Sequence, residues 1–150
     1  MEKAIELGWY GGASNKRALA ERAVNIFPID PFVLPVLLRT FHRFGQNECS
    51  LFSFLYSFEP FGLRTFASRP LKGAEPLRLY DFYDYVRSNF GHRLAVISYR
   101  SRWSVIESII ESFITEDALE LRVLKTVGLL NLINAEDLLP TEDRLAWSIA

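Results

Sequence analysis

The sequence predicts an all-α protein, an irregular bundle of about six to eight helices. Apolar side chains recur at helical spacing in most segments, and capping residues, glycines and prolines stand where helices would begin or end. The only run that resembles a β-strand, LAVISY, has no second strand pattern nearby to pair with. With 150 residues, 49% hydrophobic and 23% charged, the chain has the size and composition of one globular domain.

Aromatic residues are unusually frequent, at 14% of the chain. A small domain cannot easily bury so much apolar surface, so we expect part of it to meet a partner. The 17 basic and 18 acidic residues are mixed along the chain and give a net charge of -1. No whole-molecule field therefore favours nucleic acid or anionic lipid.

Sequence features bearing on location favour the cytoplasm. Cys49 is the only cysteine, which excludes an internal disulfide and fits a reducing compartment. The first residues lack the basic and apolar regions of a signal peptide. The longest apolar stretches, such as 32–38, are far shorter than the roughly 20 residues that span a bilayer. We expect no membrane segment.

Helices in the first half of the chain are predicted from caps and breakers. A flexible start precedes Ser14, which is placed as an N-cap, and prolines form an extended elbow before a long helix that ends at Gly45. Asn47 is the predicted N-cap of the next helix, which makes a tight corner. The predicted helices are 15–26, 32–44, 48–58 and a short turn at 61–66.

The second half begins with a loop at 69–78, which contains two prolines and a glycine. The run 94–99 is expected as helix or as extended linker. Thr115 is predicted to cap the helix after it, whose second half is apolar almost all round and therefore buried. The predicted helices are 79–89, 101–114, 116–133 and a short one after Pro140.

No complete catalytic pattern is present, so we expect no enzyme. A phosphate-binding loop needs a glycine-rich string followed by lysine, and none occurs. His42, His92 and Cys49 are scattered, whereas a zinc site needs three or four clustered ligands. Asp81 and Asp84 are expected on the solvated face of an amphipathic helix rather than in acid–base chemistry.

The run RTFHRF, residues 39–44, mixes basic and aromatic side chains. One interpretation is contact with nucleic-acid phosphates, and the other is a helix that lies partly in the core and partly at its rim. We favour the second, because three positive positions on one helix are weak evidence for a nucleic-acid site.

The segment FPIDPFVLPVLLRTFHRFGQNECSLFSFL, residues 27–55, resembles a region of large bacterial ATP-binding proteins, in which an elbow with two prolines leads to R-F-G-Q-N-E-R-S-L-F-S-F-L. The resemblance continues in EPFGL, LYDFYDYV and LELRVLKTVGLLNLI, followed by LLPTEDRLAWSIA, and covers most of the chain after Ile26. It implies the helical lid that follows a P-loop ATPase core of the AAA+ or STAND type, leading into a winged-helix-like segment.

This resemblance implies a domain plan: a flexible N-terminus at 1–13, a lid-like helical subdomain at 14–68, the loop at 69–78, and a helical bundle at 79–150 with a partial winged-helix-like end. It also implies that the corner faces a nucleotide held by the core. The implied nucleotide-binding residues are Arg43, Gly45, Asn47 and Cys49. Cys49 stands where the pattern has arginine, and a thiol cannot replace that charge. The arginine is either a phosphate sensor, which this chain then lacks, or a surface ion-pair residue.

The function expected from the resemblance is that of a non-catalytic module of, or remnant from, a nucleotide-dependent switch protein. The isolated chain would hold no cofactor, whereas the parent protein would bind ATP and Mg²⁺. Its implied partner is the P-loop ATPase core, or another protein, reached through an aromatic face around Phe52, Phe54, Tyr56 and Phe58. The alternative is a standalone adaptor, or a DNA-binding protein built on the helical corner.

Overall fold

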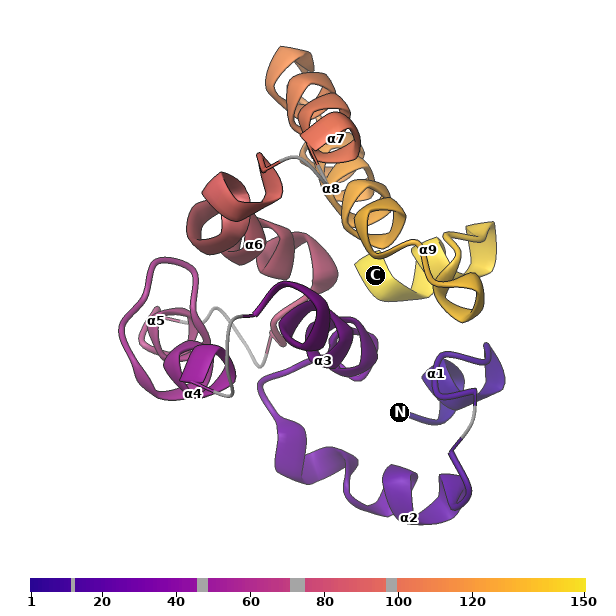
Figure 1. Cartoon of the computed structure of the whole chain (residues 1–150). Coiled ribbons are helices and arrows are strands. Elements are labelled where there is room, and N and C mark those ends of the chain that lie inside the picture. The colour runs from indigo at the N-terminus through magenta and orange to yellow at the C-terminus, as the bar shows by residue number, and fades with distance from the viewer. Residues whose placement is uncertain (12, 46–48, 71–74, 97–99) are drawn as a thin grey trace.

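The computed structural model describes residues 1–11, 13–45, 49–70, 75–96 and 100–150 and is all-helical, with no β-strand in those ranges (Figure 1). The predicted all-α, multi-helix fold is confirmed. The elements in chain order are α1 (Glu2–Glu6), α2 (Lys16–Glu21), the 3-10 helix η1 (Ala23–Ile26), α3 (Val33–Phe44), α4 (Cys49–Tyr56), α5 (Leu63–Ala67), α6 (Leu79–Leu94), α7 (Arg100–Ser112), α8 (Ala118–Ile133), the 3-10 helix η2 (Glu136–Leu138) and α9 (Glu142–Ile149).

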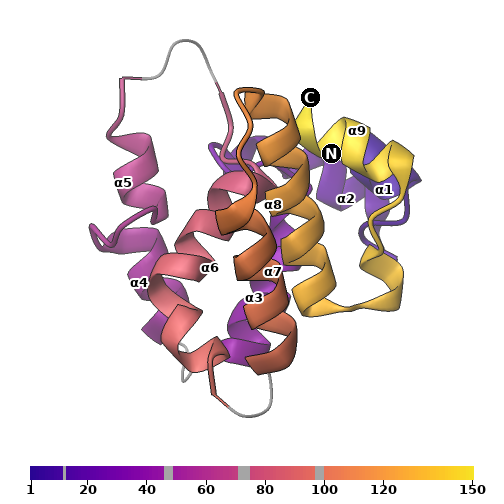
Figure 2. The same ribbon diagram turned by 90° about the horizontal axis from the view of Figure 1, so that it is seen from above.

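Helix α6 occupies the centre of the bundle and packs against α3, α8 and α9. Figures 1 and 2 both show α4 and α5 side by side at one edge, with α1, α2 and α9 toward the opposite edge. A set of aromatic rings joins α3, α4 and α6, because rings of this size remove large apolar areas from water and prefer edge-to-face contacts. The buried rings are Phe41, Phe54, Phe82, Tyr85 and Phe90.

The N-terminal segment, expected to be flexible, contains α1 and is tied to the core by Trp9. The Trp9 indole is almost fully buried, and its Nε1 donates to the carbonyl oxygen of Phe32 at 2.5 Å. The two rings also meet edge to face, with centroids 5.2 Å apart. The start of α3 therefore holds a segment that its glycines alone would leave mobile.

The helix expected at 15–26 is divided into α2 and η1, and its N-cap is Asn15 rather than Ser14. The side-chain Oδ1 of Asn15 accepts from the amide of Ala18 at 3.0 Å. Short helices depend on packing for their stability, and this region has little: none of its residues is buried, and Val24 is 82% exposed.

Gly45 ends α3, as predicted, and its amide donates to the carbonyl oxygen of Phe41 at 2.9 Å. A side chain at this position would place Cβ only 2.4 Å from that same oxygen, so the helix can end this way only with glycine. Asn47, the predicted N-cap of the following helix, lies outside the described residues.

Helices α7 and α8 form an antiparallel pair around Gly128. A Cβ at this position would lie 2.8 Å from Cγ2 of Ile106, so the missing side chain lets the two helices approach closely. The N-cap of α8 is Asp117, whose Oδ1 accepts from the amide of Leu119 at 2.8 Å. Thr115, the predicted cap, instead accepts from the amide of Asp117. Thr115 stands two residues before Asp117, so its hydroxyl is too far along the chain to reach the first amides of the helix.

One hydrophobic core draws residues from both sides of the predicted loop at 69–78, from Ala4 to Leu138. The predicted domain boundaries stay a prediction. Within the described ranges, no helix combines the length and the apolarity required to cross a bilayer.

Candidate functional site

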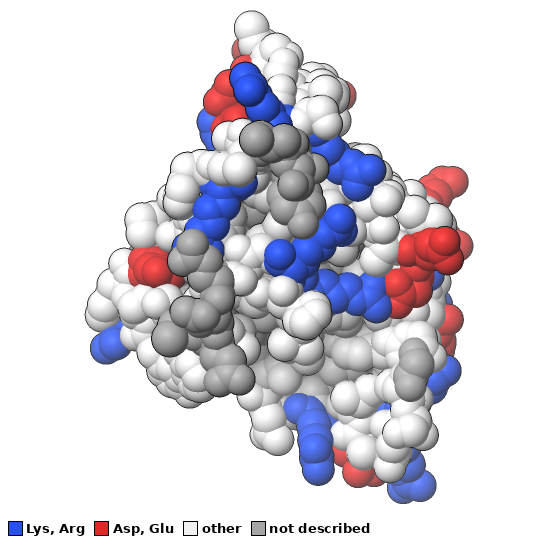
Figure 3. Space-filling model, viewed as in Figure 1, with Lys and Arg blue, Asp and Glu red and all other residues white. Residues whose placement is uncertain are grey.

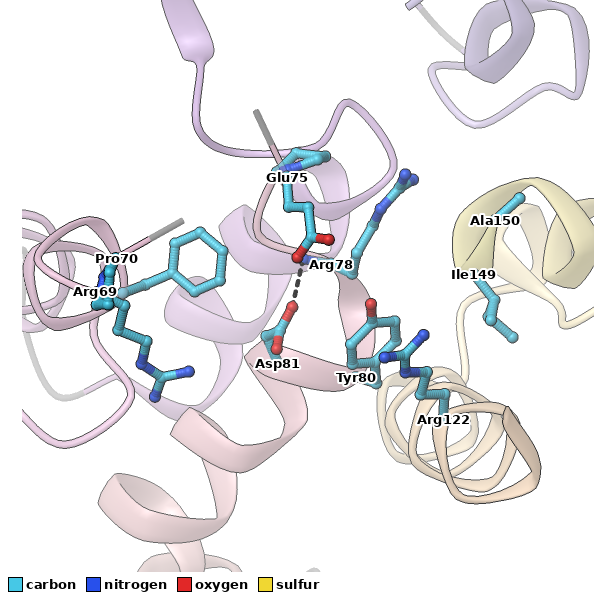
Figure 4. A pocket seen from close by; sticks show the side chains of 11 residues that line it. Arg69, Pro70, Glu75, Arg78, Tyr80, Asp81, Arg122, Ile149 and Ala150 are labelled. Atoms are coloured by element: carbon cyan, nitrogen blue, oxygen red, sulfur yellow. Dashed lines mark hydrogen bonds between the residues drawn. The ribbon is translucent and has the colours of Figure 1, made fainter. Parts of the chain in front are cut away.

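A cavity of about 440 Å³ opens where the end of α5, the start of α6, α8 and the end of α9 meet (Figure 4). We call it the arginine pocket. Its lining residues are Phe66, Arg69, Pro70, Glu75, Pro76, Arg78, Tyr80, Asp81, Arg122, Ile149 and Ala150. Its volume lies within the range of small-molecule sites.

The main chain before α6 is held in place by the proline elbow. The amide of Leu77 donates to the carbonyl oxygen of Pro28 at 2.6 Å, and the amide of Asp30 donates to that of Leu77 at 3.0 Å. These two bonds make a single parallel bridge between the elbow and the segment at 75–78. The bridge places Arg78 and the start of α6 at the rim of the pocket.

Asp30 and Arg78 form a partly buried ion pair at this rim. Nη1 of Arg78 donates to Oδ2 of Asp30 at 2.8 Å, and the other oxygen of Asp30 accepts from the amide of Phe32. Burial of the carboxylate raises the pKa of Asp30, although the Phe32 amide and Arg78 act in the opposite direction. Much of the charge of Arg78 is therefore balanced within the chain.

Asp81 and Asp84 were predicted to lie on a solvated face, and the structure corrects this. Oδ2 of Asp81 accepts from the amide of Arg78 at 2.9 Å and so satisfies a free donor at the start of α6. Burial raises the pKa of Asp81. Asp84 pairs with Nζ of Lys125 on α8 at 2.8 Å, so both acids hold the fold together.

Arg122 and Tyr80 form the opposite wall of the pocket. The guanidinium of Arg122 lies 5.0 Å from the centroid of the Tyr80 ring. Burial raises the pKa of Tyr80, so its phenol stays protonated at neutral pH and can donate a hydrogen bond. Figure 4 shows Arg69 on the opposite side of Asp81 from Tyr80 and Arg122. Figure 3 shows basic side chains gathered over the region where α6 and α8 meet.

The arginine pocket contains donors suited to binding an anion. Guanidinium groups and a neutral phenol are donors suited to carboxylate or phosphate oxygens. Among the described residues that line the pocket, none is Ser, Thr, Cys or His. The pocket therefore offers positive charge and hydrogen-bond donors beside the carboxylates of Glu75 and Asp81.

A second candidate site is the surface of α4 and the turn after it, which we call the α4 aromatic surface: Phe52, Tyr56 and Phe58. These side chains are 56%, 67% and 65% exposed, respectively. The rings of Phe52 and Tyr56 stack with centroids 6.2 Å apart, and the guanidinium of Arg64 lies 4.2 Å from the Phe58 ring. Phe54, which the predicted aromatic face included, is instead fully buried against α6.

The four predicted nucleotide-binding residues are only partly described. Nη1 of Arg43 donates to the carbonyl oxygen of Ile133 at 2.6 Å, so this side chain satisfies a free acceptor at the end of α8. Gly45 ends α3, and Cys49 begins α4, with its side chain outside the description. Asn47 is also outside it. A nucleotide-binding role for the four residues stays a prediction.

The RTFHRF run lies in α3, and its two arginines bind within the chain. Arg39 makes two hydrogen bonds to the carboxylate of Asp137, at 2.6 and 2.5 Å, while Arg43 binds Ile133. This arrangement matches the interpretation of a helix that is part core and part rim. No group of three or more potential metal-ligating side chains occurs in the part of the chain that the structure describes.

Sequence reasoning missed the arginine pocket because its walls come from three separate segments. Arg69 and Arg78 are the first and last residues of the predicted loop, whereas Arg122 follows more than forty residues later on α8. In the sequence, the only indication of this region is the predicted loop at 69–78. Comparison of the chain with family models, curated proteins and solved structures finds no match.

Proposed function

We propose that the chain is a non-catalytic helical module that contacts another protein through the α4 aromatic surface. The observation that carries the proposal is the exposure of Phe52, Tyr56 and Phe58, which belong to α4 and the turn after it, while α4 itself lies at an edge of the bundle (Figure 1). Leaving three large rings in water forgoes the free energy that burial would give them. Aromatic side chains are also the residues most enriched where proteins meet.

The surface has further properties of a contact site. Phe52 and Tyr56 are already stacked, so their rings lose less conformational freedom when a partner covers them. Arg64, held by a hydrogen bond to the carbonyl oxygen of Tyr56 at 3.0 Å, adds a charged group at the margin. An apolar centre with a polar rim is the usual composition of a protein interface.

The partner we propose is the P-loop ATPase core of a nucleotide-dependent switch protein. This step is supported by the motif resemblance at 27–55, which includes all of α4 except its last residue, Tyr56. In this proposal α4 packs on the core, and the corner at Gly45 lies toward its nucleotide. ATP and Mg²⁺ belong to the core, and the chain contributes contacts.

The test uses a purified P-loop ATPase core taken from a protein that carries the same motif, titrated with the chain by isothermal calorimetry. We expect saturable binding, weakened about ten-fold or more in the double variant Phe52→Ser/Tyr56→Ser, because truncated aromatic anchors commonly cost more than about 1–2 kcal/mol each. Val24→Ser is the matched control, since this apolar side chain is 82% exposed on η1.

Three results would contradict the proposal. The first is absence of binding by the unchanged chain, and the second is equal binding by the double variant and the Val24→Ser control. The third is ATP turnover by the isolated chain. Salt-dependent binding of duplex DNA would support the alternative of a DNA-binding protein, since phosphate contacts weaken as salt rises.

A further inference from the structure

An apolar groove of about 410 Å³ lies between α8 and α9, next to the arginine pocket. We call it the α8/α9 groove. Its lining residues are Leu119, Val123, Glu142, Leu145, Ala146, Ile149 and Ala150. Apart from Glu142 at one end these side chains are aliphatic, and Leu119 is 54% exposed. The groove is thus suited to a flexible aliphatic group.

The α8/α9 groove and the arginine pocket adjoin at the end of α9, because Ile149 and Ala150 line both. Arg122 is on the pocket side of this junction, on the same helix as Leu119 and Val123 of the groove. Figure 4 shows Ile149 facing the space beside Arg122 and Tyr80. One elongated ligand could therefore reach apolar side chains at one end and donors at the other.

The polar groups at the junction differ in whether they already have a partner within the chain. Arg78 pairs with Asp30, and Asp81 accepts from the amide of Arg78. Within the described residues, the guanidinium of Arg122 lies over the Tyr80 ring and makes no ion pair, although its charge lowers the pKa of the nearby Asp81 carboxyl against the larger effect of burial. A stacked guanidinium keeps its in-plane N–H groups available for an anion. The protonated phenol of Tyr80 lies beside it as a second donor.

We propose that the groove and the pocket together bind an anionic amphiphile: an unbranched aliphatic chain that ends in one carboxylate or phosphate monoester. The chain lies along Leu119, Val123 and Leu145, and the head group accepts hydrogen bonds from Arg122 and Tyr80. Burial of methylene groups and pairing of the anion with a guanidinium act together, so neither a free anion nor a neutral alkane uses the whole site.

The other end of the groove restricts the ligand further. Glu142 lies seven residues before Ile149 on α9, which corresponds to roughly 10 Å along the helix. A second anionic group at that end would meet the carboxylate of Glu142 and be repelled. The site therefore prefers an amphiphile with one charged end to a dicarboxylate, and its length suits a chain of medium size.

The test is a titration of the full chain, labelled with ¹⁵N, with octyl phosphate and with octanoate below their micellar concentrations. We expect saturable shifts of amide signals confined to α8, α9 and the start of α6. Shortening the chain from octyl to hexyl and to butyl phosphate should weaken binding about four-fold for each methylene removed. Inorganic phosphate and suberate, a dicarboxylate, should bind far more weakly.

Two variants separate the head-group contact from the chain contact. Arg122→Gln should weaken octyl phosphate about ten-fold or more and leave 1-octanol unaffected, because only the anion uses the guanidinium. Leu119→Ser should weaken both ligands. Arg17→Gln on α2 is the control for a change of charge, since Arg17 is 90% exposed and pairs with Glu21 on the same helix.

The proposal is overturned if octyl phosphate does not saturate, if its affinity does not depend on chain length, or if Arg122→Gln binds as the control does. Shifts spread over the whole bundle would show detergent-like unfolding and would also overturn it. Circular dichroism of each variant confirms that a loss of binding is not a loss of fold. The α4 aromatic surface shares no residue with this site, so either proposal can fail alone.

Discussion

Helices α4 and α8 both have strongly apolar sequences, yet the fold treats them differently. Helix α8 contacts α3, α6, α7 and α9, and most apolar side chains in its second half are buried. The buried positions there are Thr126, Gly128, Leu129, Leu130, Leu132 and Ile133. Helix α4 lies at the edge of the bundle, where it packs with α5, and among its described side chains only Phe54 is fully buried in the core.

The difference shows that an apolar helix is not buried by its composition alone. The number of neighbouring helices decides how many of its faces are covered, and α4 has neighbours on one side (Figure 2). An apolar composition therefore has two consequences: the buried side chains of α8 contribute to stability, whereas α4 leaves Phe52 and Tyr56 available to a partner. Stability measurements can test each half of this comparison.

The largest expected effect is the difference in unfolding free energy between substitutions on the two faces of α4. Phe54→Ala should lower the free energy of unfolding by about 3–5 kcal/mol, because it leaves a cavity among the rings of Phe41, Phe82 and Tyr85. Phe52→Ala should change it by about 0.5 kcal/mol or less, since the ring is mostly in solvent. Urea unfolding measures both, and similar losses would mean that the two faces do not differ.

A smaller effect tests how closely α7 covers α8. Gly128→Ala should destabilise by about 1–3 kcal/mol, because the new Cβ would stand 2.8 Å from the branched side chain of Ile106. Gly91→Ala on α6 is the matched control: the nearest atom would be 3.9 Å away, so the change should stabilise by about 0.5–1 kcal/mol through helix propensity. Equal shifts in the urea midpoint would argue against close packing of α7 on α8.

The smallest effect concerns the Arg39–Asp137 pair, which joins α3 to η2 just after α8. The hydrogen bonds from Arg39 lower the pKa of Asp137, so the carboxylate stabilises the fold above its unfolded pKa, about 3.9. This contribution is lost as pH falls through the lowered folded pKa.

Asp137→Asn should therefore lower the free energy of unfolding by about 0.2–1 kcal/mol at pH 7, a modest value because both side chains are more than a third exposed. The difference between variant and unchanged chain should disappear toward pH 2. Urea unfolding at several pH values checks this expectation. A difference that grows in acid would show that Asp137 is not held as an anion in the folded state.

More of the fold than of the candidate site could be predicted from the sequence. Helical spacing located most helices to within a few residues, and the glycine at position 45 marked the end of α3. The caps were less predictable: Asn15 and Asp117 replaced the expected Ser14 and Thr115, because neighbouring polar residues compete for the same free amides. The N-terminal segment depends on a bond from Trp9 to Phe32, which local patterns do not report.

The arginine pocket and the α8/α9 groove could not be predicted, since each needs side chains brought together from distant helices. Arg122 by itself reads as a charged residue on a helix, and only the packing of α8 beside α6 places it on the ring of Tyr80. The same holds for Arg43, which the motif associated with nucleotide and the structure places at the end of α8.

The sequence by itself determined that this protein is helical, because periodic apolar positions and chain breakers act over a few residues and are written locally. Only the tertiary structure decided which apolar faces are covered and which charges are paired. Burial and ion pairing depend on distances between segments far apart in the chain, so an exposed Phe52, a buried Phe54 and a stacked Arg122 follow from where the helices pack.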